Sequence, residues 1–223
     1  MYRLMVLMSL SIATSYAQVA TNPPSITAVG TASVSVAPDV ARVDVGVYTQ
    51  AATAQAASQA NATLANTVIT AEQSLLGASA TIKTVNYTLS PVYNSPPPGQ
   101  SATIIGYSVN NTVEIKLVDL SKIGASVDAA IQAGANRVQG ISFDLQDRNP
   151  PTAQALKAAS VSALSQVGAI AAGLNLHVGG VLHASEGVNT STPVLGVAAP
   201  STPIQTGLVV IQASVTLEVA IAQ

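Results

Sequence analysis

Strict alternation of apolar and polar side chains restricts the fold of this chain more than any other feature. Every second residue is apolar in the C-terminal segment, which contains Val209, Ile211, Ala213, Val215, Leu217, Val219 and Ile221. The same period relates Val43, Val45 and Val47, and it also relates Ile105, Tyr107, Val109, Val113, Ile115 and Leu117. Such alternation is typical of strands with one buried and one solvated face, as in antiparallel sheets. Further strands are expected at about 26–36, 81–93, 137–146 and 177–186.

Three other segments have the spacing of helices. The first, about 51–76, is rich in Ala and is expected to end at Gly77, because glycine accepts the left-handed conformation of a helix C-terminus. Its residues at helical spacing are Ala57, Ala60, Leu64, Val68, Ala71 and Leu75. The second, about 120–133, begins after the capping residue Asp119 and stops at Gly134. The third runs from Asn149-Pro150 to Gly173. One side of it contains Leu156, Ser160, Leu164, Val167, Ala171 and Leu174.

The order of these elements predicts the fold class. Residues 39–146 alone follow the order strand, helix, strand, strand, helix, strand, which is the split βαβ arrangement of ferredoxin-like folds. A hairpin, the third helix and the C-terminal strands extend this unit. We therefore predict an α+β fold with a mainly antiparallel or mixed sheet and long helices packed on one side.

The N-terminus has the features of a secretory signal peptide. Arg3 supplies the positive charge, Leu4 to Ile12 the apolar stretch, and Ser15-Tyr16-Ala17 the cleavage site. The competing interpretation is a membrane anchor, but a span needs about 20 apolar residues, and this run is much shorter. We expect residues 1–17 to be a cleaved signal peptide and residues 18–223 to form one exported domain. No later segment is expected to cross a membrane.

Charged residues make up only 8% of the chain, and this shortage of charge predicts its partners. The formal net charge is −2 and the lysines are scattered, so nucleic acid is not an expected partner. The outer sides of helical segments 51–76 and 150–173 carry almost no charge, which is typical of an interface core. We therefore expect a homo-oligomer that covers a surface containing Ala155, Ala159 and Ser162. The alternative is a surface adapted as a whole to low charge.

No residue pattern predicts a reaction. The sequence lacks the motifs of serine hydrolases, phosphate loops, dinucleotide sites and zinc proteases, and it contains no Cys for thiolate chemistry. His177 and His183 would lie roughly 20 Å apart on one strand unless Gly179-Gly180 folds it back. Asp39 is expected to accept backbone hydrogen bonds in a tight connection. We predict that the protein is not an enzyme and has no catalytic, cofactor-binding or metal-binding residues.

Asp144 and Asp147 flank the end of a predicted strand and are the only paired-carboxylate candidate. Arg148 lies beside them, and solvated ion pairing is therefore the ordinary interpretation. Two connections are also distinctive: residues 94–100, which contain three consecutive prolines, and residues 187–206, which are rich in Thr, Pro and Gly. Long connections of this kind are either mobile or functional, and the sequence leaves both interpretations open.

A spaced series of short motifs closely resembles the SIMPL-domain family, also called domain of unknown function 541, of the periplasmic or outer-membrane immunogenic type. The series consists of Pro91-Val92-Tyr93, Ile105-Gly106-Tyr107, Asp119-Leu120, Gly134-Ala135-Asn136 and Gly140-Ile141-Ser142-Phe143. The resemblance extends upstream to Pro38-Asp39 and downstream to the closing strand at 208–221. It implies a bacterial envelope protein that is linked to resistance to oxidative stress and has no agreed chemistry.

Two functions are consistent with these observations. The favoured one is a non-enzymatic, exported protein, periplasmic or associated with the outer membrane, that self-assembles and contacts envelope proteins. The alternative is a binding module that uses its proline-containing loops to hold a small or polymeric envelope ligand. The mass in solution separates the two, because the first predicts a large oligomer and the second a monomer with a ligand-dependent melting temperature.

Overall fold

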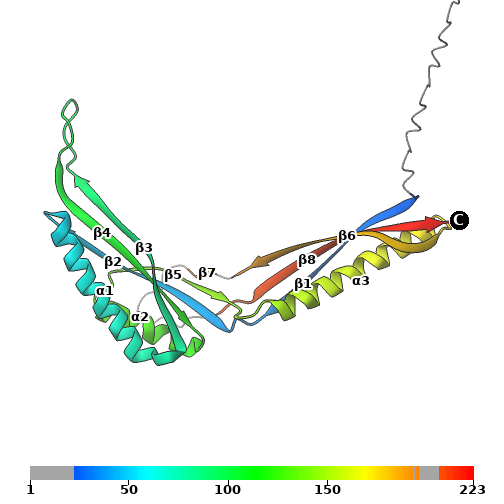
Figure 1. Cartoon of the computed structure of the whole chain (residues 1–223), viewed down its shortest axis with the longest axis horizontal. Coiled ribbons are helices and arrows are strands. Elements are labelled where there is room, and N and C mark those ends of the chain that lie inside the picture. The colour runs from blue at the N-terminus through cyan, green and yellow to red at the C-terminus, as the bar shows by residue number, and fades with distance from the viewer. Residues whose placement is uncertain (1–22, 193, 196–205) are drawn as a thin grey trace, which may run out of the picture.

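The computed structural model describes residues 23–192, 194–195 and 206–223, and these form two lobes that meet at an angle (Figure 1). One lobe contains a five-stranded sheet in the order β3-β4-β2-β5-β7, and the other a three-stranded sheet in the order β1-β8-β6. Helices α1 and α2 cover one face of the first sheet, and α3 covers one face of the second (Figure 1). The predicted signal peptide lies outside the described residues.

The first lobe confirms the predicted split βαβ order. Its elements are β2 (Val40–Ala51), α1 (Ala54–Leu76), β3 (Ala80–Tyr93), β4 (Ile104–Leu117), α2 (Ile123–Gln132), β5 (Arg137–Asp144) and the short β7 (Val194–Leu195). Short 3₁₀ turns at Gly77–Ser79 and Leu120–Lys122 adjoin α1 and α2. Because β4 pairs antiparallel with both β2 and β3, these two strands run parallel with β4 between them. The predicted α+β fold class is therefore confirmed.

Local signals correctly placed the ends of the helical segments at Gly77, Asp119 and Gly134, although α1 begins at Ala54 rather than at about residue 51 and Asp119 caps the 3₁₀ turn that precedes α2. Gly77 and Gly134 both have positive φ, and the Asp119 side chain accepts a hydrogen bond from the Ser121 backbone N–H. The alternation predicted for β4 holds from Val109 to Leu117, whose apolar members are buried against the helices. It does not hold at Ile105, which is exposed because β4 continues beyond the helices at that end.

The second lobe consists of β1 (Ser25–Val36), α3 (Asn149–Gly173), β6 (His177–Ser191) and β8 (Val209–Ala222). The central strand β8 pairs antiparallel with β1 over its whole length and with β6 on its other side. Alternate residues of β8, from Val209 to Val219, are buried in the second core against α3, as predicted. Strand β6 extends five residues beyond its predicted end, because residues 187–191 continue the pairing with β8. Most of the remaining predicted loop lies outside the described residues.

The buried sides of the long helices correct two predictions. In α3 the buried residues are Ala155, Ala159, Ala163, Val167 and Ala171, whereas Leu164 and Leu174 are exposed. A Cβ added at Gly30 of β1 would overlap the backbone of Ala159 and Ala163, so the strand and the helix lie too close for any residue larger than glycine at position 30. Ala155 and Ala159 therefore contribute to the lobe's own core and cannot form the predicted surface between subunits. In α1, Ala57 and Val68 are buried as predicted. The other buried residues are Asn61, Ala65, Glu72 and Leu76, each one position after a predicted one.

Helix α3 also corrects the expectation that no later segment has the composition of a membrane span. It has 25 residues and is apolar enough to cross a bilayer by length and composition alone. However, its alanine-rich side is buried against β1 and β8 in the second core. A core helix meets the same criteria of length and composition.

Candidate functional site

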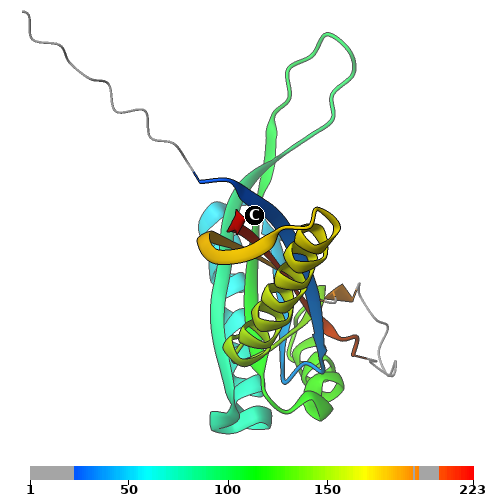
Figure 2. The same ribbon diagram turned by 90° about the vertical axis from the view of Figure 1, so that its right-hand side faces the viewer.

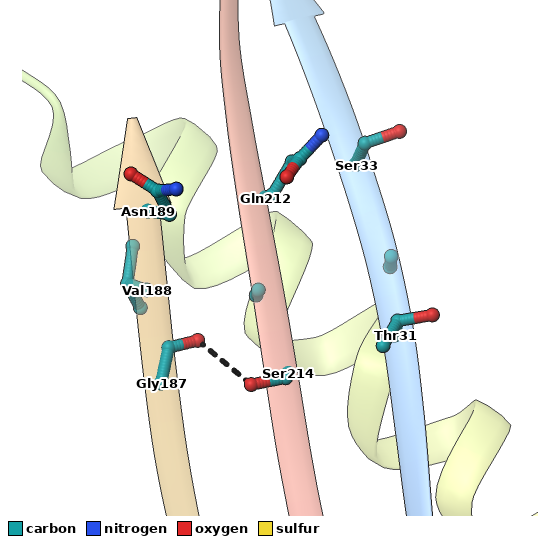
Figure 3. Close-up of a pocket in the computed structure, with 9 residues that line it drawn as sticks. Thr31, Ser33, Gly187, Val188, Asn189, Gln212 and Ser214 are labelled. Atoms are coloured by element: carbon teal, nitrogen blue, oxygen red, sulfur yellow. Dashed lines mark hydrogen bonds between the residues drawn. The ribbon is translucent and has the colours of Figure 1, made fainter. Parts of the chain in front are cut away.

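The face of the three-stranded sheet that points away from α3 carries a hollow of about 680 Å³. Side chains from all three strands line it: Thr31, Ala32 and Ser33 of β1, Gly187, Val188 and Asn189 of β6, and Gln212, Ala213 and Ser214 of β8. Figure 3 shows the labelled hydroxyl and amide side chains in front of the strands and α3 behind them. The site thus joins segments that lie far apart in the sequence.

Strand register brings these polar side chains into two rows across the sheet. Ser33 pairs with Gln212, which in turn pairs with Asn189. In the neighbouring row, Thr31 pairs with Ser214, and Ser214 pairs with Gly187. Gly187 has no side chain to fill this row, and the Ser214 hydroxyl donates a hydrogen bond of 3.4 Å to its carbonyl oxygen (Figure 3). A Cβ added at Gly187 would lie 2.9 Å from the Ser214 hydroxyl oxygen, so the glycine allows this close contact.

The chemistry available in the hollow is neutral hydrogen bonding. Hydroxyl groups of Ser and Thr and amide groups of Asn and Gln each supply donors and acceptors. None of the described residues that line the hollow is an acid, a base or a charged group. The arrangement can therefore hold an uncharged polar ligand or another polypeptide, and it provides no pair of groups for nucleophilic or acid–base catalysis.

The two histidines lie on β6, outside the hollow. His177 pairs with Ala222 of β8, and His183 lies opposite Glu218. The pairing is irregular between Val178 and His183, where Gly179-Gly180 occurs. Among the residues that the structure describes, no group of three or more His, Cys, Asp or Glu side chains could hold a metal ion.

Asp39 connects the two lobes through backbone hydrogen bonds. Its carboxylate accepts a bond of 2.7 Å from the Gln146 N–H, and its own N–H donates a bond of 3.1 Å to the Asp144 carbonyl oxygen. These contacts tie the β1–β2 connection to the β5–α3 connection. They agree with the structural role predicted for Asp39.

Asp144 forms an ion-pair cluster at the same connection. Arg148 contacts its carboxylate at 2.6 Å and Arg42 at 3.1 Å. Burial raises the pKa of Asp144, but hydrogen bonds from Arg148, the Leu145 N–H and Arg42 outweigh burial and lower it overall. Asp147 does not take part, because its carboxylate accepts a bond from the Asn149 N–H. The two carboxylates therefore have separate structural partners. Ion pairing with Arg148 is confirmed for Asp144, but its carboxylate is buried rather than solvated as predicted.

Glu72 is a buried carboxyl group that the sequence did not identify. It lies between α1 and α2, where the Ser126 hydroxyl donates a bond of 2.8 Å to its Oε2. Its Oε1 has no hydrogen-bond partner in the described part of the chain. Burial raises the pKa of Glu72 to about 7, and the bond from Ser126 opposes this change. Glu72 lies four residues from Val68 and from Leu76, and this spacing places the three side chains on the same side of the helix. The spacing is the sequence signal that could have predicted its burial.

The two tyrosine-containing motifs meet on the β3–β4 hairpin. Pro91 pairs with Tyr107 and Val92 with Gly106, so motifs that are separate in the sequence lie side by side. The hairpin continues beyond the body of the first lobe and ends in the proline-containing connection (Figure 2). We call residues 88–107 the hairpin arm.

The sequence matches one protein family and several known relatives. The chain matches the family model described as SIMPL, a protein of unknown function (DUF541), over residues 26–219. It is 27% identical over 174 residues to the 26 kDa periplasmic immunogenic protein of Brucella melitensis, covering 76% of this chain and 69% of that protein. It is 31% identical over 159 residues to the uncharacterized protein YggE of Escherichia coli K12, covering 71% of this chain and 63% of YggE.

Proposed function

Because this chain belongs to the SIMPL (DUF541) family, we propose that it is a non-enzymatic protein of the bacterial envelope that self-associates and contributes to resistance to oxidative stress. The name of the Brucella relative supports a periplasmic location. The predicted signal peptide supports the same location. Outer-membrane association through other envelope proteins is part of the proposal.

Strand β6 is the observation that carries the proposal of self-association. It is an edge strand of 15 residues, and all of them are exposed except the half-buried Thr190. Exposed edges readily pair with another chain unless charges, prolines or bulges protect them. Irregular pairing interrupts β6 only before His183, and the regular part from His183 to Ser191 contains no proline and one carboxylate, Glu186. This regular part is therefore available to a second copy.

Large apolar side chains are exposed on β6 and also on the neighbouring helix α3. The exposed ones on α3 and β6 are Val161, Leu164, Ile170, Leu174, Val178, Val181, Leu182 and Val188. Lys157 is the only charged residue of α3. Interface cores are depleted in charge in this way. The proposed surface is thus the exposed part of α3 together with β6, and it replaces the surface predicted from the sequence.

Val188→Lys tests this surface. Val188 is 43% exposed, so the substitution should leave the fold intact while placing a charge on the edge. We expect light scattering to show an oligomer for the wild type and a monomer for the variant, whose circular dichroism spectrum should match that of the wild type. Val29→Lys is the matched control, since Val29 is 49% exposed on β1, and it should remain oligomeric. A monomeric wild type, or an oligomer that survives Val188→Lys, would contradict the proposal.

The composition supports a role under oxidative stress that does not depend on scavenging. The chain contains no Cys and no Trp, and its three Met residues are Met1, Met5 and Met8, all in the predicted signal peptide. Cys and Met are the side chains that form sulfenic acids and sulfoxides. From residue 9 onward the chain therefore lacks sulfur altogether, and oxidants have no sulfur in it to convert.

The mature chain, which is expected to start at Gln18, should resist excess hydrogen peroxide. Neither the covalent mass of the chain nor the mass of its assembly in solution should change. The uncleaved precursor is a matched control, because its three Met residues should gain oxygen. Mass spectrometry and light scattering provide the two measurements. A deletion strain that survives peroxide as well as its parent would refute the link to oxidative stress.

The hollow of Figure 3 favours a second candidate, a binding module for an uncharged envelope ligand. Its neutral hydroxyl and amide groups suit polar polymers without charge. The two candidates differ in solution, because a binding module would be a monomer whose melting temperature rises with ligand. Gln212→Ala should abolish that rise without altering the mass in solution.

A further inference from the structure

We propose that one water molecule is bound inside the first lobe, between α1 and the sheet, where it donates hydrogen bonds to the side-chain oxygens of Asn61 and Asn111. Asn61 is 0% exposed and Asn111 is 8% exposed. The Oδ1 atom of each is buried and has no hydrogen-bond partner in the described part of the chain. Buried polar atoms are nearly always paired, either with protein groups or with ordered water. Each of these two oxygens therefore needs a donor.

Strand register places the two side chains beside the same residue, Val47 of β2. Asn111 of β4 is the antiparallel partner of Val47, in a ladder that runs without a register shift from Ala41 to Ala51. The side chains of such partners lie on the same face of a sheet, and Val47 belongs to the core beneath α1 and α2. Asn61 of α1 reaches the same point, because its Nδ2 donates a bond of 2.8 Å to the Val47 carbonyl oxygen.

The carbonyl group of Val47 points toward β4. The Asn136 side chain, immediately before β5, bonds both the N–H and the carbonyl oxygen of Tyr48, at 2.8 and 2.7 Å. The backbone groups of Tyr48 therefore point toward β5, and those of the preceding residue, Val47, point the opposite way. The Asn61 amide thus donates from the side of α1 into the space between β2 and β4, next to the side chain of Asn111.

This end of the interface between α1 and the sheet is polar. The Thr49 hydroxyl donates a bond of 2.9 Å to the Ala57 carbonyl oxygen. Tyr87, the partner of Asn111 on β3, donates a bond of 3.1 Å from its hydroxyl to the Ser58 hydroxyl. The buried residues of α1 in the first hydrophobic core all lie further along the helix: Ala65, Val68 and Leu76. Apolar cavities stay dry, whereas a polar site with several partners holds water.

The two oxygens suit water better than an ion. Water donates two hydrogen bonds and can therefore pair with both Oδ1 atoms at once. A calcium or magnesium ion needs about six oxygen ligands, ordinarily with a carboxylate among them, and neither side chain supplies one. The bound water would connect the first half of α1 to β4, beside Tyr87 at the base of the hairpin arm.

A crystal structure of the mature protein at a resolution that shows ordered water tests the proposal directly. We expect one water molecule within about 3.0 Å of both the Asn61 and the Asn111 Oδ1 atoms. A direct hydrogen bond between the two amides, which a reversed Asn111 amide group would form, would overturn the proposal. A dry contact between the two side chains would do the same.

Substitutions test whether the two side chains share one bound molecule in solution. Asn61→Leu and Asn111→Leu each remove one acceptor at similar side-chain size, so each should release the water and lower the folding equilibrium constant measured by urea unfolding. The double variant has only one water to release. Its loss should therefore be smaller than the product of the two single losses, by about fivefold or more.

The matched control combines Asn111→Leu with Asn66→Leu, which changes an exposed asparagine of α1, and here the losses should multiply. Independent losses for Asn61→Leu and Asn111→Leu would overturn the proposal, as would an Asn111→Leu variant more stable than the wild type, because its oxygen would then be unpaired. If sodium or potassium stabilised the wild type but not Asn111→Leu, the bound species would be a cation instead. The crystal structure decides between these outcomes even if a leucine variant fails to fold.

Discussion

Gly30→Ala is expected to destabilise the second lobe by about 3 kcal/mol or more, at the upper end of the range for overpacked cores. The added Cβ would overlap the backbone oxygen of Ala159 and the backbone nitrogen of Ala163. Backbone atoms cannot rotate away as a side chain can, so α3 must move off β1 and loosen the alanine contacts. Since domains of this size are stable by about 5–15 kcal/mol, the loss is a large fraction of the total.

Thermal and urea unfolding of the purified variant measure this loss. Gly168→Ala is the matched control, because the same methyl group added in α3 meets nothing within 4 Å. Replacing a glycine inside a helix should raise stability by about 0.5–1 kcal/mol. The two variants should therefore shift the midpoint in opposite directions. Equal midpoints for Gly30→Ala and the wild type would mean that β1 and α3 do not approach as closely as the structure describes.

Glu72→Gln should make the first lobe more stable at alkaline pH by up to about 3 kcal/mol. Burial raises the pKa of Glu72 from 4.5 to about 7 in the folded protein, and a displacement of this size corresponds to roughly that energy. No charged side chain of the described residues contributes to it. Glutamine keeps the shape of the side chain and an oxygen for the Ser126 hydroxyl, but it cannot ionise.

The direction in which stability changes with pH depends on whether the folded or the unfolded state binds the Glu72 proton more tightly. Below about pH 4.5 both the folded and unfolded forms of Glu72 are protonated, and the group favours the folded state fully. Between about pH 4.5 and 7 the unfolded state loses its proton first, so stability falls as the pH rises. Above about pH 7 both states are ionised and the loss is complete.

Unfolding curves from pH 4 to pH 9 provide the measurement. The wild type should lose stability across the window, and Glu72→Gln should remove this fall. Glu186→Gln, on the exposed strand β6, controls for the chemical change and should keep the wild-type profile. A Glu72→Gln profile parallel to that of the wild type would show that the carboxyl group is solvated rather than buried.

Local physical chemistry accounts for what the sequence determined by itself. Alternation between adjacent residues decides which side chains of a strand share a face, and it correctly predicted the buried sides of β8 and of β4 from Val109 to Leu117. The conformational freedom of glycine and the capping oxygen of Asp119 likewise depend on a few neighbouring residues, so the ends at Gly77, Gly134 and Asp119 were predictable. The split βαβ order followed from these elements.

The tertiary structure decided which side of each helix is buried. A helix of alanine, serine and leucine has no unique apolar side, and the sequence favours the bulkier residues. At Gly30 the strand approaches the backbone of Ala159 and Ala163, so these alanines are buried while Leu164 is exposed. The same ambiguity in α1 concealed the burial of Glu72, because a carboxyl group is ordinarily expected in water.

The candidate site depended even more on tertiary structure. Gln212 and Ser214 could be assigned to the solvated face of a strand, but Asn189 fell in the predicted loop. Strands β1 and β6 are separated by most of the chain and meet only through β8. The hairpin arm similarly brings Pro91 against Tyr107 by strand pairing. Residues close in sequence determine local conformation, whereas a site requires distant segments to pack together, and that packing is a property of the whole chain.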